Sequence, residues 1–152
     1  MQNLKTLYVY RPLVNAKELL KWAEDQGFEK ILDPSDMHVT IAFSKDKVNW
    51  SQFKPRESKI TIKLNSSTVK QLGEDAVVVA FDSDLLQKRW KEFRDGGCSW
   101  DWPSYQPHVS ITYHGSNLNL KNVKPYTGTL VFGPEIFKEV DLDWKEKVKN
   151  EQ

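Results

Sequence analysis

The chain has 152 residues, a length that suits one domain with a substantial buried core. Its 22 basic and 21 acidic side chains give a net charge of +1. This favours a small or short ligand over a long nucleic acid, because binding a long duplex usually requires a strongly basic face. The single cysteine excludes an intramolecular disulfide and, with only three histidines present, a cysteine-rich zinc site.

The N-terminal residues contain no signal-peptide pattern and run directly into a predicted strand. No apolar run approaches the roughly 20 residues that a membrane span needs. We therefore expect a cytoplasmic protein with no membrane partner.

The first third of the chain has a strand–helix–strand pattern. Apolar and aromatic side chains alternate over residues 4–11, which predicts a strand. Asn15 is a good N-cap for the following helix, and Glu18 occupies the position of a capping-box partner. The helix is predicted to reach about Gln26. A loop then leads to a second strand over residues 37–44.

The same order of elements returns later in the chain. Residues 76–82 form an apolar strand, and Ser83 or Asp84 caps a helix that reaches about Arg94. A loop then leads to a strand over residues 108–114. Corresponding elements are about 70 residues apart, a repeat that indicates two related structural units.

This repeat predicts an α+β fold with two pseudo-symmetric strand–helix–strand lobes and a central cleft. Residues 1–152 would form a single bilobal domain, with lobe 1 over about 1–58 and lobe 2 over about 59–152. Additional strands at 59–66 and 127–144 would complete the two sheets, with exchange of strands between the lobes allowed.

A four-residue motif occurs once in each copy. The two motifs are His38-Val39-Thr40-Ile41 and His108-Val109-Ser110-Ile111. Side chains alternate between the faces of a strand, so each histidine shares a face with the hydroxyl two residues on, about 6.6 Å away. The opposite face is predicted to carry apolar side chains that pack on the helix, namely Val39, Ile41 and Phe43 in the first copy and Val109, Ile111 and Tyr113 in the second.

A twofold arrangement would place both histidines and both hydroxyls around one point. Phosphodiester cleavage requires a base for the nucleophile and an acid for the leaving oxygen, and a side-chain pKa of about 6.5 suits histidine to both roles. Thr40 and Ser110 can donate hydrogen bonds to the non-bridging oxygens. No metal ion or other cofactor is required. A single strand histidine is more often structural, but a pair at equivalent repeat positions favours catalysis.

The paired His-x-Thr/Ser motifs in two strand–helix–strand units resemble the 2H (two-histidine) phosphoesterase superfamily. Within it, the chain is most similar to the bacteriophage anti-CBASS nucleases. The similar segments are Leu7-Tyr8-Val9, Val14-Asn15-Ala16, Met37-His38-Val39-Thr40-Ile41-Ala42 and Pro107-His108-Val109-Ser110-Ile111-Thr112-Tyr113. Thr is equally common at the position of Ser110 in such motifs.

The resemblance implies a bilobal 2H fold and metal-independent hydrolysis of the 3′-5′ bonds of cyclic di- and trinucleotides. Bacteria signal infection with these second messengers, so their hydrolysis in the cytoplasm of the infected cell would counter CBASS immunity. The resemblance also assigns the catalytic and phosphate-holding roles to His38, Thr40, His108 and Ser110.

For a ribonucleotide substrate, one histidine would take the proton of the ribose 2′-OH, which attacks the adjacent phosphorus. The other would protonate the leaving 5′-oxygen. The symmetry of the sequence does not distinguish the base from the acid.

Aromatic residues near the motifs are candidates for substrate binding. Tyr8 and Tyr10 have the parity opposite to Leu7 and Val9, so they would face the cleft, and Tyr10 is the candidate for stacking on a base. Loop 98–107 runs into His108 and carries Trp102 and Tyr105, which would form a base clamp. Ordinary packing in the sheet or in a minor core is the alternative for these residues.

Glu139 and Trp144 lie on or beyond the last predicted strand. From the resemblance, the carboxylate would recognise a nucleobase edge and the indole would stack on a base. Exposure to solvent without a binding role is the alternative for Glu139.

Three other functions remain open on the sequence alone. One is an RNA-end 2′,3′-cyclic or 2′,5′ phosphodiesterase with the same motifs. Another is a non-catalytic sponge that binds cyclic nucleotides in the same cleft. The third is an unrelated α/β interaction domain. The oligomeric state and the preferred cyclic nucleotide cannot be inferred from the residues.

Overall fold

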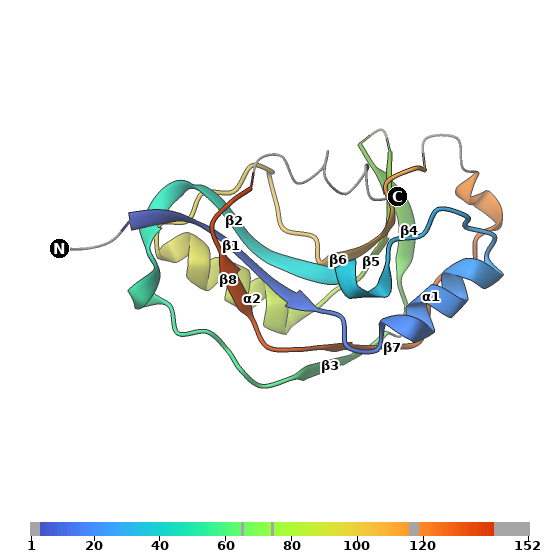
Figure 1. Ribbon diagram of the computed structural model, residues 1–152, viewed down its shortest axis with the longest axis horizontal. Helices are drawn as coiled ribbons and strands as arrows, with labels where there is room; N and C mark the ends of the chain where they lie inside the picture. Colours follow the sequence, from blue (N-terminus) through green and yellow to red (C-terminus); the bar gives the residue numbers. More distant parts are fainter. Residues whose placement is uncertain (1–3, 65, 74, 116–118, 142–152) are drawn as a thin grey trace.

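The computed structural model of the protein describes residues 4–64, 66–73, 75–115 and 119–141 (Figure 1). The two predicted strand–helix–strand units are present. The first comprises β1 (Leu4–Pro12), α1 (Ala16–Asp25) and β2 (His38–Asn49). The second comprises β5 (Ala76–Ala80), α2 (Asp84–Asp95) and β6 (His108–Thr112). The remaining strands are β3 (Ile60–Lys63), β4 (Thr68–Leu72), β7 (Thr129–Phe132) and β8 (Ile136–Lys138). The fold is therefore α+β.

The two units share one antiparallel sheet. Its six strands have the order β4-β5-β6-β2-β1-β8, and β3 pairs with β7 in a separate two-stranded sheet. The sequence predicts one sheet for each unit; the structure instead joins the units where Val39 of β2 pairs with Val109 of β6. Strand β8 pairs with β1 of the first unit, so a late strand completes the early half of the sheet. The division into two lobes with a cleft remains a prediction.

One face of the large sheet is apolar and packs against the helices. Leu7, Val9 and Ile41 are fully buried on β1 and β2, and α2 contributes Leu86 and Phe93 to the same core. In Figure 1, α2 and the β3–β7 pair lie below the sheet. The opposite face of the sheet carries the histidines. No helix in the described ranges is long and apolar enough to cross a lipid bilayer.

The two helices begin in different ways. Ser83 caps α2 as predicted, because its side-chain oxygen accepts a hydrogen bond of 3.2 Å from a backbone N–H in the first turn. The predicted capping box at Asn15 is absent, since the Asn15 side chain makes no cap hydrogen bond. It instead donates to Thr129 O at 2.7 Å and accepts from Val131 N at 2.9 Å, which ties the start of α1 to β7.

Both histidine strands contain a bulge just after the hydroxyl residue. The pairing between β1 and β2 passes from Val9↔Ala42 to Tyr10↔Thr40, and that between β5 and β6 passes from Val77↔Thr112 to Val78↔Ser110. Ile41 and Ile111 are the extra residues. An extra residue reverses the alternation of the side chains that follow. Residues beyond each bulge therefore lie on the face opposite to the one that strict alternation predicts.

The bulges correct two predicted orientations. The sequence predicts Phe43 and Tyr113 on the apolar face, but the extra residue interrupts the strict alternation of side chains on which that prediction depends. Phe43 pairs with Tyr8 across β1 and β2, with ring centroids 6.0 Å apart, and Tyr113 interacts with the Ser110 hydroxyl. Both rings therefore lie on the face that carries the histidines.

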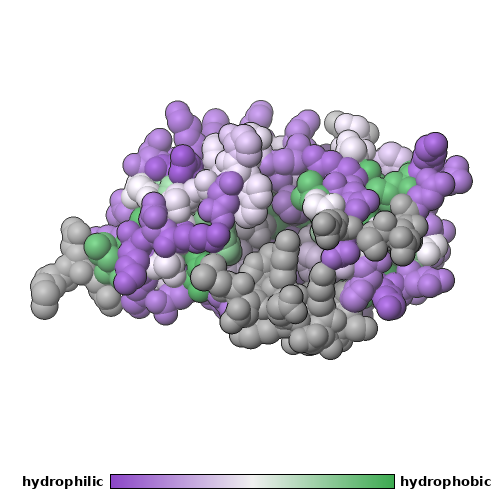
Figure 2. All heavy atoms as spheres, turned by 90° about the horizontal axis from the view of Figure 1, so that it is seen from above, coloured by the Kyte–Doolittle hydropathy of each residue, from purple (hydrophilic) through white to green (hydrophobic). Residues whose placement is uncertain are grey.

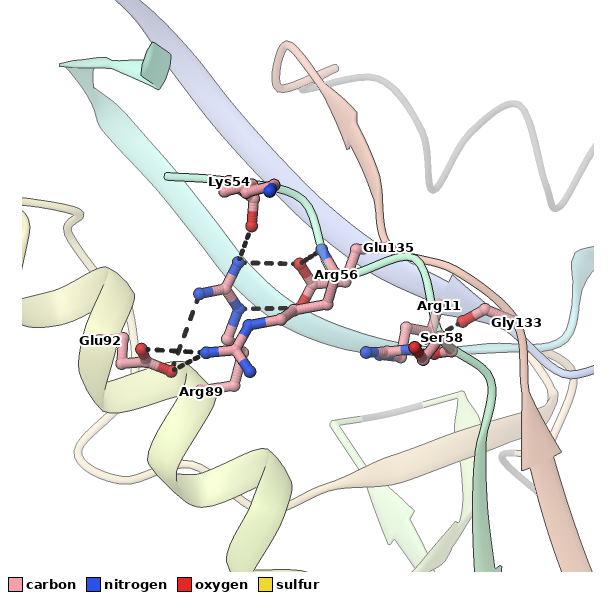
Figure 3. A network of polar contacts seen from close by, with 8 residues as sticks. All are labelled: Arg11, Lys54, Arg56, Ser58, Arg89, Glu92, Gly133 and Glu135. Carbon is pink, nitrogen blue, oxygen red and sulfur yellow. Dashed lines mark hydrogen bonds and ion pairs between the residues drawn. The ribbon is translucent and has the colours of Figure 1, made fainter. Parts of the chain in front are cut away.

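A buried ion pair connects α2 to the start of β8 (Figure 3). Arg89 donates two hydrogen bonds of 2.9 Å to the Glu135 carboxylate, which also accepts from Arg56 N at 2.9 Å. The Glu135 side chain is fully buried. An adjacent hollow of about 620 Å³ is lined by residues 52–54, Arg56 and residues of α2 that include Arg89 and Glu92. Arg56 and Arg89 both form ion pairs with Glu92, and Arg89 also pairs with Glu135, so we assign this network a structural role.

Removal of the Glu135 carboxylate leaves Arg89 buried without a counterion. We expect Glu135→Ala to lower the free energy of unfolding by about 3–5 kcal/mol, as measured by urea denaturation. Arg56→Ala is the matched control, since it removes only the exposed contact of 3.3 Å with Glu92 and should change stability by less than about 1 kcal/mol. Similar small losses in both variants would contradict the assignment.

Candidate active site

The two motif histidines are held by the same local contact. His38 Nδ1 lies 2.7 Å from the carbonyl oxygen of Asp36, and His108 Nδ1 lies 2.8 Å from that of Gln106. A carbonyl can only accept, so Nδ1 carries the proton in both rings. In a neutral ring, Nε2 therefore presents a lone pair that can accept a proton. In each copy the carbonyl comes from the residue two positions before the histidine.

The pairing of Val39 with Val109 brings the two motifs side by side. In an antiparallel pair, the residues that flank such a pair face each other across the strands on the opposite side of the sheet, with Cβ atoms about 4.5–5.5 Å apart. The face away from the helices thus carries His38 beside Ser110 and Thr40 beside His108. The structure therefore gathers the four predicted catalytic residues into one group.

Both histidines have lowered pKa values. Burial is the main cause, because it disfavours the charged imidazolium. The proximity of His108 lowers the pKa of His38 further, and the Lys70 ammonium lowers that of His108. The hydrogen bonds to the carbonyls of Asp36 and Gln106 act in the opposite direction. Both rings are therefore mainly neutral at pH 7 in the free protein, and a bound phosphate anion would favour protonation of one of them.

Tyr8 contacts the pair directly. Its hydroxyl lies 2.9 Å from His38 Nε2 and 3.4 Å from Thr40 Oγ1. Burial raises the pKa of Tyr8 well above its ordinary value, so the hydroxyl keeps its proton and can donate to the neutral ring. Tyr10 stacks on Tyr8 with centroids 5.0 Å apart and lies 5.2 Å from the ring of His38. The alternation of side chains in the sequence predicts that both tyrosines lie on this face. It gives no reason to expect that Tyr8, and not Tyr10, makes the hydrogen bond to His38.

The two aromatic candidates of loop 98–107 have different positions. Trp102 is 55% exposed, and its ring lies 6.2 Å from that of Phe43 on the histidine face. Tyr105 is only 5% exposed, stacks on Trp90, and donates a hydrogen bond of 2.7 Å to Thr40 O. The predicted role of Tyr105 in a base clamp is therefore wrong, because its ring is buried. Tyr105 instead supports the strand that carries Thr40.

Lysines of the two edge strands extend this face. Lys70 on β4 pairs with Val78, which pairs with Ser110, so all three side chains share the face of the histidines. On the other edge, Lys138 of β8 places its Nζ 5.6 Å from the centroid of the Tyr10 ring. Neither lysine has an ion-pair partner among the described residues. Both can neutralise a phosphate bound on this face.

Glu139 and Trp144 are the remaining candidates for substrate binding. Glu139 is exposed immediately after β8, and Trp144 lies outside the described residues. Within the described ranges, no three histidine, cysteine, aspartate or glutamate side chains gather as metal ligands would. The roles of Glu139 and Trp144 and metal independence stay predictions.

Solved structures with the same fold include E. coli LigT and a protein described as a phosphoesterase. The E. coli LigT complex with NADP+ superposes with a TM-score of 0.65 at 13% sequence identity, covering 92% of this chain and 90% of that one. A crystal structure described as a phosphoesterase has a TM-score of 0.62 at 13% identity, covering 90% of this chain and 89% of that one. At this identity, the similarity establishes the fold alone.

Sequence relatives are anti-CBASS proteins. Those from Caulobacter sp. (strain RHG1) and Sphingomonas paeninsulae are 44% and 41% identical over 95% and 93% of this chain. The chain spans about a quarter of the length of these two bacterial relatives, 24% in each case. The relative from Acinetobacter phage Ac42 is 29% identical over 131 residues, which are 79% of this chain and 83% of that protein.

The family described as "Anti-CBASS protein Acb1" matches residues 5–147, nearly the whole chain. This match covers both histidine motifs, and the LigT-like fold agrees with it. The resemblance to the anti-CBASS family seen in the sequence is thereby confirmed, and the chain belongs to the anti-CBASS Acb1 family.

Proposed function

We propose that this chain hydrolyses the 3′-5′ bonds of cyclic di- and trinucleotide second messengers and thereby counters CBASS immunity. The observation that carries the proposal is the pairing of β2 with β6. It sets His38 and His108, which share one tautomer, each opposite a hydroxyl residue of the other strand. Membership of the anti-CBASS family supports the substrate class. His38, Thr40, His108 and Ser110 are the proposed catalytic residues, and no metal ion takes part.

The reaction follows from the positions of the proton carriers. A neutral histidine removes the proton of the ribose 2′-OH through Nε2, and the 2′-oxygen forms a bond to phosphorus. The P–O5′ bond breaks as the protonated histidine gives its proton to the leaving 5′-oxygen. The products are a 2′,3′-cyclic phosphate and a 5′-OH. Attack of water then opens the cyclic phosphate and completes the hydrolysis. Thr40 and Ser110 stabilise the non-bridging oxygens by hydrogen bonds.

The charges around the histidines favour His108 as the base and His38 as the acid. His108 lowers the pKa of His38 and Asp36 raises it. The effect of His108 requires a charged His108, so when His108 is the neutral base the effect of Asp36 remains and supports a protonated His38. Lys70 lowers the pKa of His108, which supports its neutral form. Both effects are smaller than burial, which acts on the two rings alike.

Replacement of either catalytic histidine should remove one proton transfer. We expect His38→Ala and His108→Ala each to lower kcat for cyclic dinucleotides by about 10²–10⁴-fold, read by chromatography of the products. His114→Gln is the control, since His114 lies two residues beyond the end of β6 and outside the group, and this variant should retain activity. EDTA should have no effect, whereas a 2′-deoxy substrate should not be cleaved.

The same experiment separates the rival functions. A sponge would bind tightly without turnover, and the alanine variants would then show no rate change. An RNA-end phosphodiesterase would prefer 2′,3′-cyclic or 2′,5′-linked ends over cyclic dinucleotides in a substrate panel.

The assignment of acid and base predicts a selective rescue. A substrate with sulfur in place of the leaving 5′-oxygen needs little protonation, because a thiolate leaves readily. We expect this substrate to restore most of the lost rate in His38→Ala and little in His108→Ala. The reverse pattern would exchange the two roles.

The lowered pKa values predict the pH dependence. As pH rises through the pKa of the base, the rate increases; as pH rises through the pKa of the acid, the rate decreases. Because both pKa values lie below 6.5 in the free protein, kcat/KM should be bell-shaped with a maximum below pH 6.5. The profile of kcat should shift to higher pH, because bound phosphate stabilises the imidazolium. A flat profile would be incompatible with this pair.

A further inference from the structure

An exposed tryptophan adjoins the candidate active site. Trp102 exposes 55% of its surface, which is unusual for so large an apolar side chain and is more common at binding sites. It belongs to the loop that leads into β6 and His108. The ring centroid of Trp102 lies 4.9 Å from that of Trp100 and 6.2 Å from that of Phe43. The exposed part of the indole therefore adjoins a second aromatic ring.

The loop is fixed to β2 by polar contacts. Lys45 Nζ lies 2.8 Å from the Asp101 carboxylate, one residue before Trp102. Ser99 Oγ accepts hydrogen bonds from the backbone N–H groups of Lys45 and Asp46 at 3.0 and 3.2 Å. These contacts hold the loop in place before any ligand binds, so stacking on the indole would require little further ordering.

Aromatic contacts connect Trp102 to the catalytic group. Phe43 contacts Tyr8 with centroids 6.0 Å apart, and the Tyr8 hydroxyl lies 2.9 Å from His38 Nε2. Phe43 reaches this face only because of the bulge at Ile41. The view from above in Figure 2 shows that hydrophilic residues predominate over the described surface, with paler and hydrophobic residues between them. The histidine face itself combines aromatic rings, such as Trp102 and Tyr10, with the charge of Lys138.

The spacing indicates which part of a substrate would reach these rings. From His38 to Phe43, β2 advances about 13 Å once the bulge is taken into account. One ribose separates a nucleobase from its own phosphate, and this is too short to bridge that distance. The base of a neighbouring nucleotide in the same substrate can reach it. A 2′,3′-cyclic mononucleotide has no such base.

We propose that Phe43 and Trp102 form a stacking platform for a nucleobase of a nucleotide next to the one that is cleaved. This rests on the proposed phosphodiesterase function and deepens it, because the platform selects cyclic oligonucleotides over 2′,3′-cyclic mononucleotides. Stacking on an aromatic residue tolerates any base, so the platform recognises the presence of a second nucleotide and not its identity.

The test compares Trp102→Ala with Trp102→Phe and the wild-type protein. For cyclic di- and trinucleotides, we expect Trp102→Ala to raise KM by about 10- to 100-fold with kcat nearly unchanged, and Trp102→Phe to retain most of the affinity. For 2′,3′-cyclic AMP, all three proteins should have the same kcat/KM. Leu85→Ala is the control for loss of an exposed apolar side chain, since Leu85 is 53% exposed on α2.

Binding measured without turnover separates this proposal from the proposed function. Titration of each protein with a 2′-deoxy cyclic dinucleotide should show the same loss of affinity in Trp102→Ala. Equal affinity in Trp102→Ala and wild type, while wild type cleaves cyclic dinucleotides, would overturn the platform alone. An equal loss on 2′,3′-cyclic AMP would overturn the selection of a second nucleotide. A wild-type protein that neither binds nor cleaves any cyclic oligonucleotide would overturn both proposals.

Discussion

The pairing of β2 with β6 is the contact on which the candidate site depends. His38 and His108 lie far apart in the sequence and meet only because Val39 pairs with Val109. Both valines are fully buried against the helices, so the apolar face specifies the register. A slip of one residue would turn the valines of one strand toward the polar face and expose them to water. The hydrophobic core therefore aligns the proposed catalytic side chains, although none of them belongs to it.

The two halves of the site share local geometry and differ in their surroundings. The carbonyl two residues before each histidine fixes the same tautomer in both copies. Only His38 has the tyrosine hydroxyl of Tyr8 at Nε2, and only His108 has its pKa lowered by Lys70. Two rings with one tautomer and different neighbours can take opposite roles in one reaction. In a fully symmetric pair, only the orientation of the substrate would separate the base from the acid.

Local patterns in the sequence predicted most of the helices and strands and the two motifs that the structure brings together. They failed where the side-chain orientation depends on a neighbouring strand. The repeat, both helices and the His-x-Thr/Ser spacing depend on periodicity within a single segment. The bulges at Ile41 and Ile111 depend on the partner strands, so the orientation of Phe43 was predicted wrongly. Tyr105 was placed in the clamp because its loop is irregular, but Trp90 buries its ring. The single six-stranded sheet likewise depends on a pairing that neither unit encodes alone.

The net charge of +1 is compatible with a polyanionic ligand because the charges are unevenly placed. The ion pair of Arg89 with Glu135 lies at α2, away from the histidine face, so this guanidinium is already neutralised. Lys70 and Lys138 lie on the two edge strands of that face, with the histidines and tyrosines between them. A ligand that contacts both lysines spans several strands, and a phosphate at each lysine would neutralise its charge. A 2′,3′-cyclic mononucleotide carries one, whereas a cyclic oligonucleotide carries one for each nucleotide. The placement of charge therefore favours the larger substrate independently of the aromatic rings.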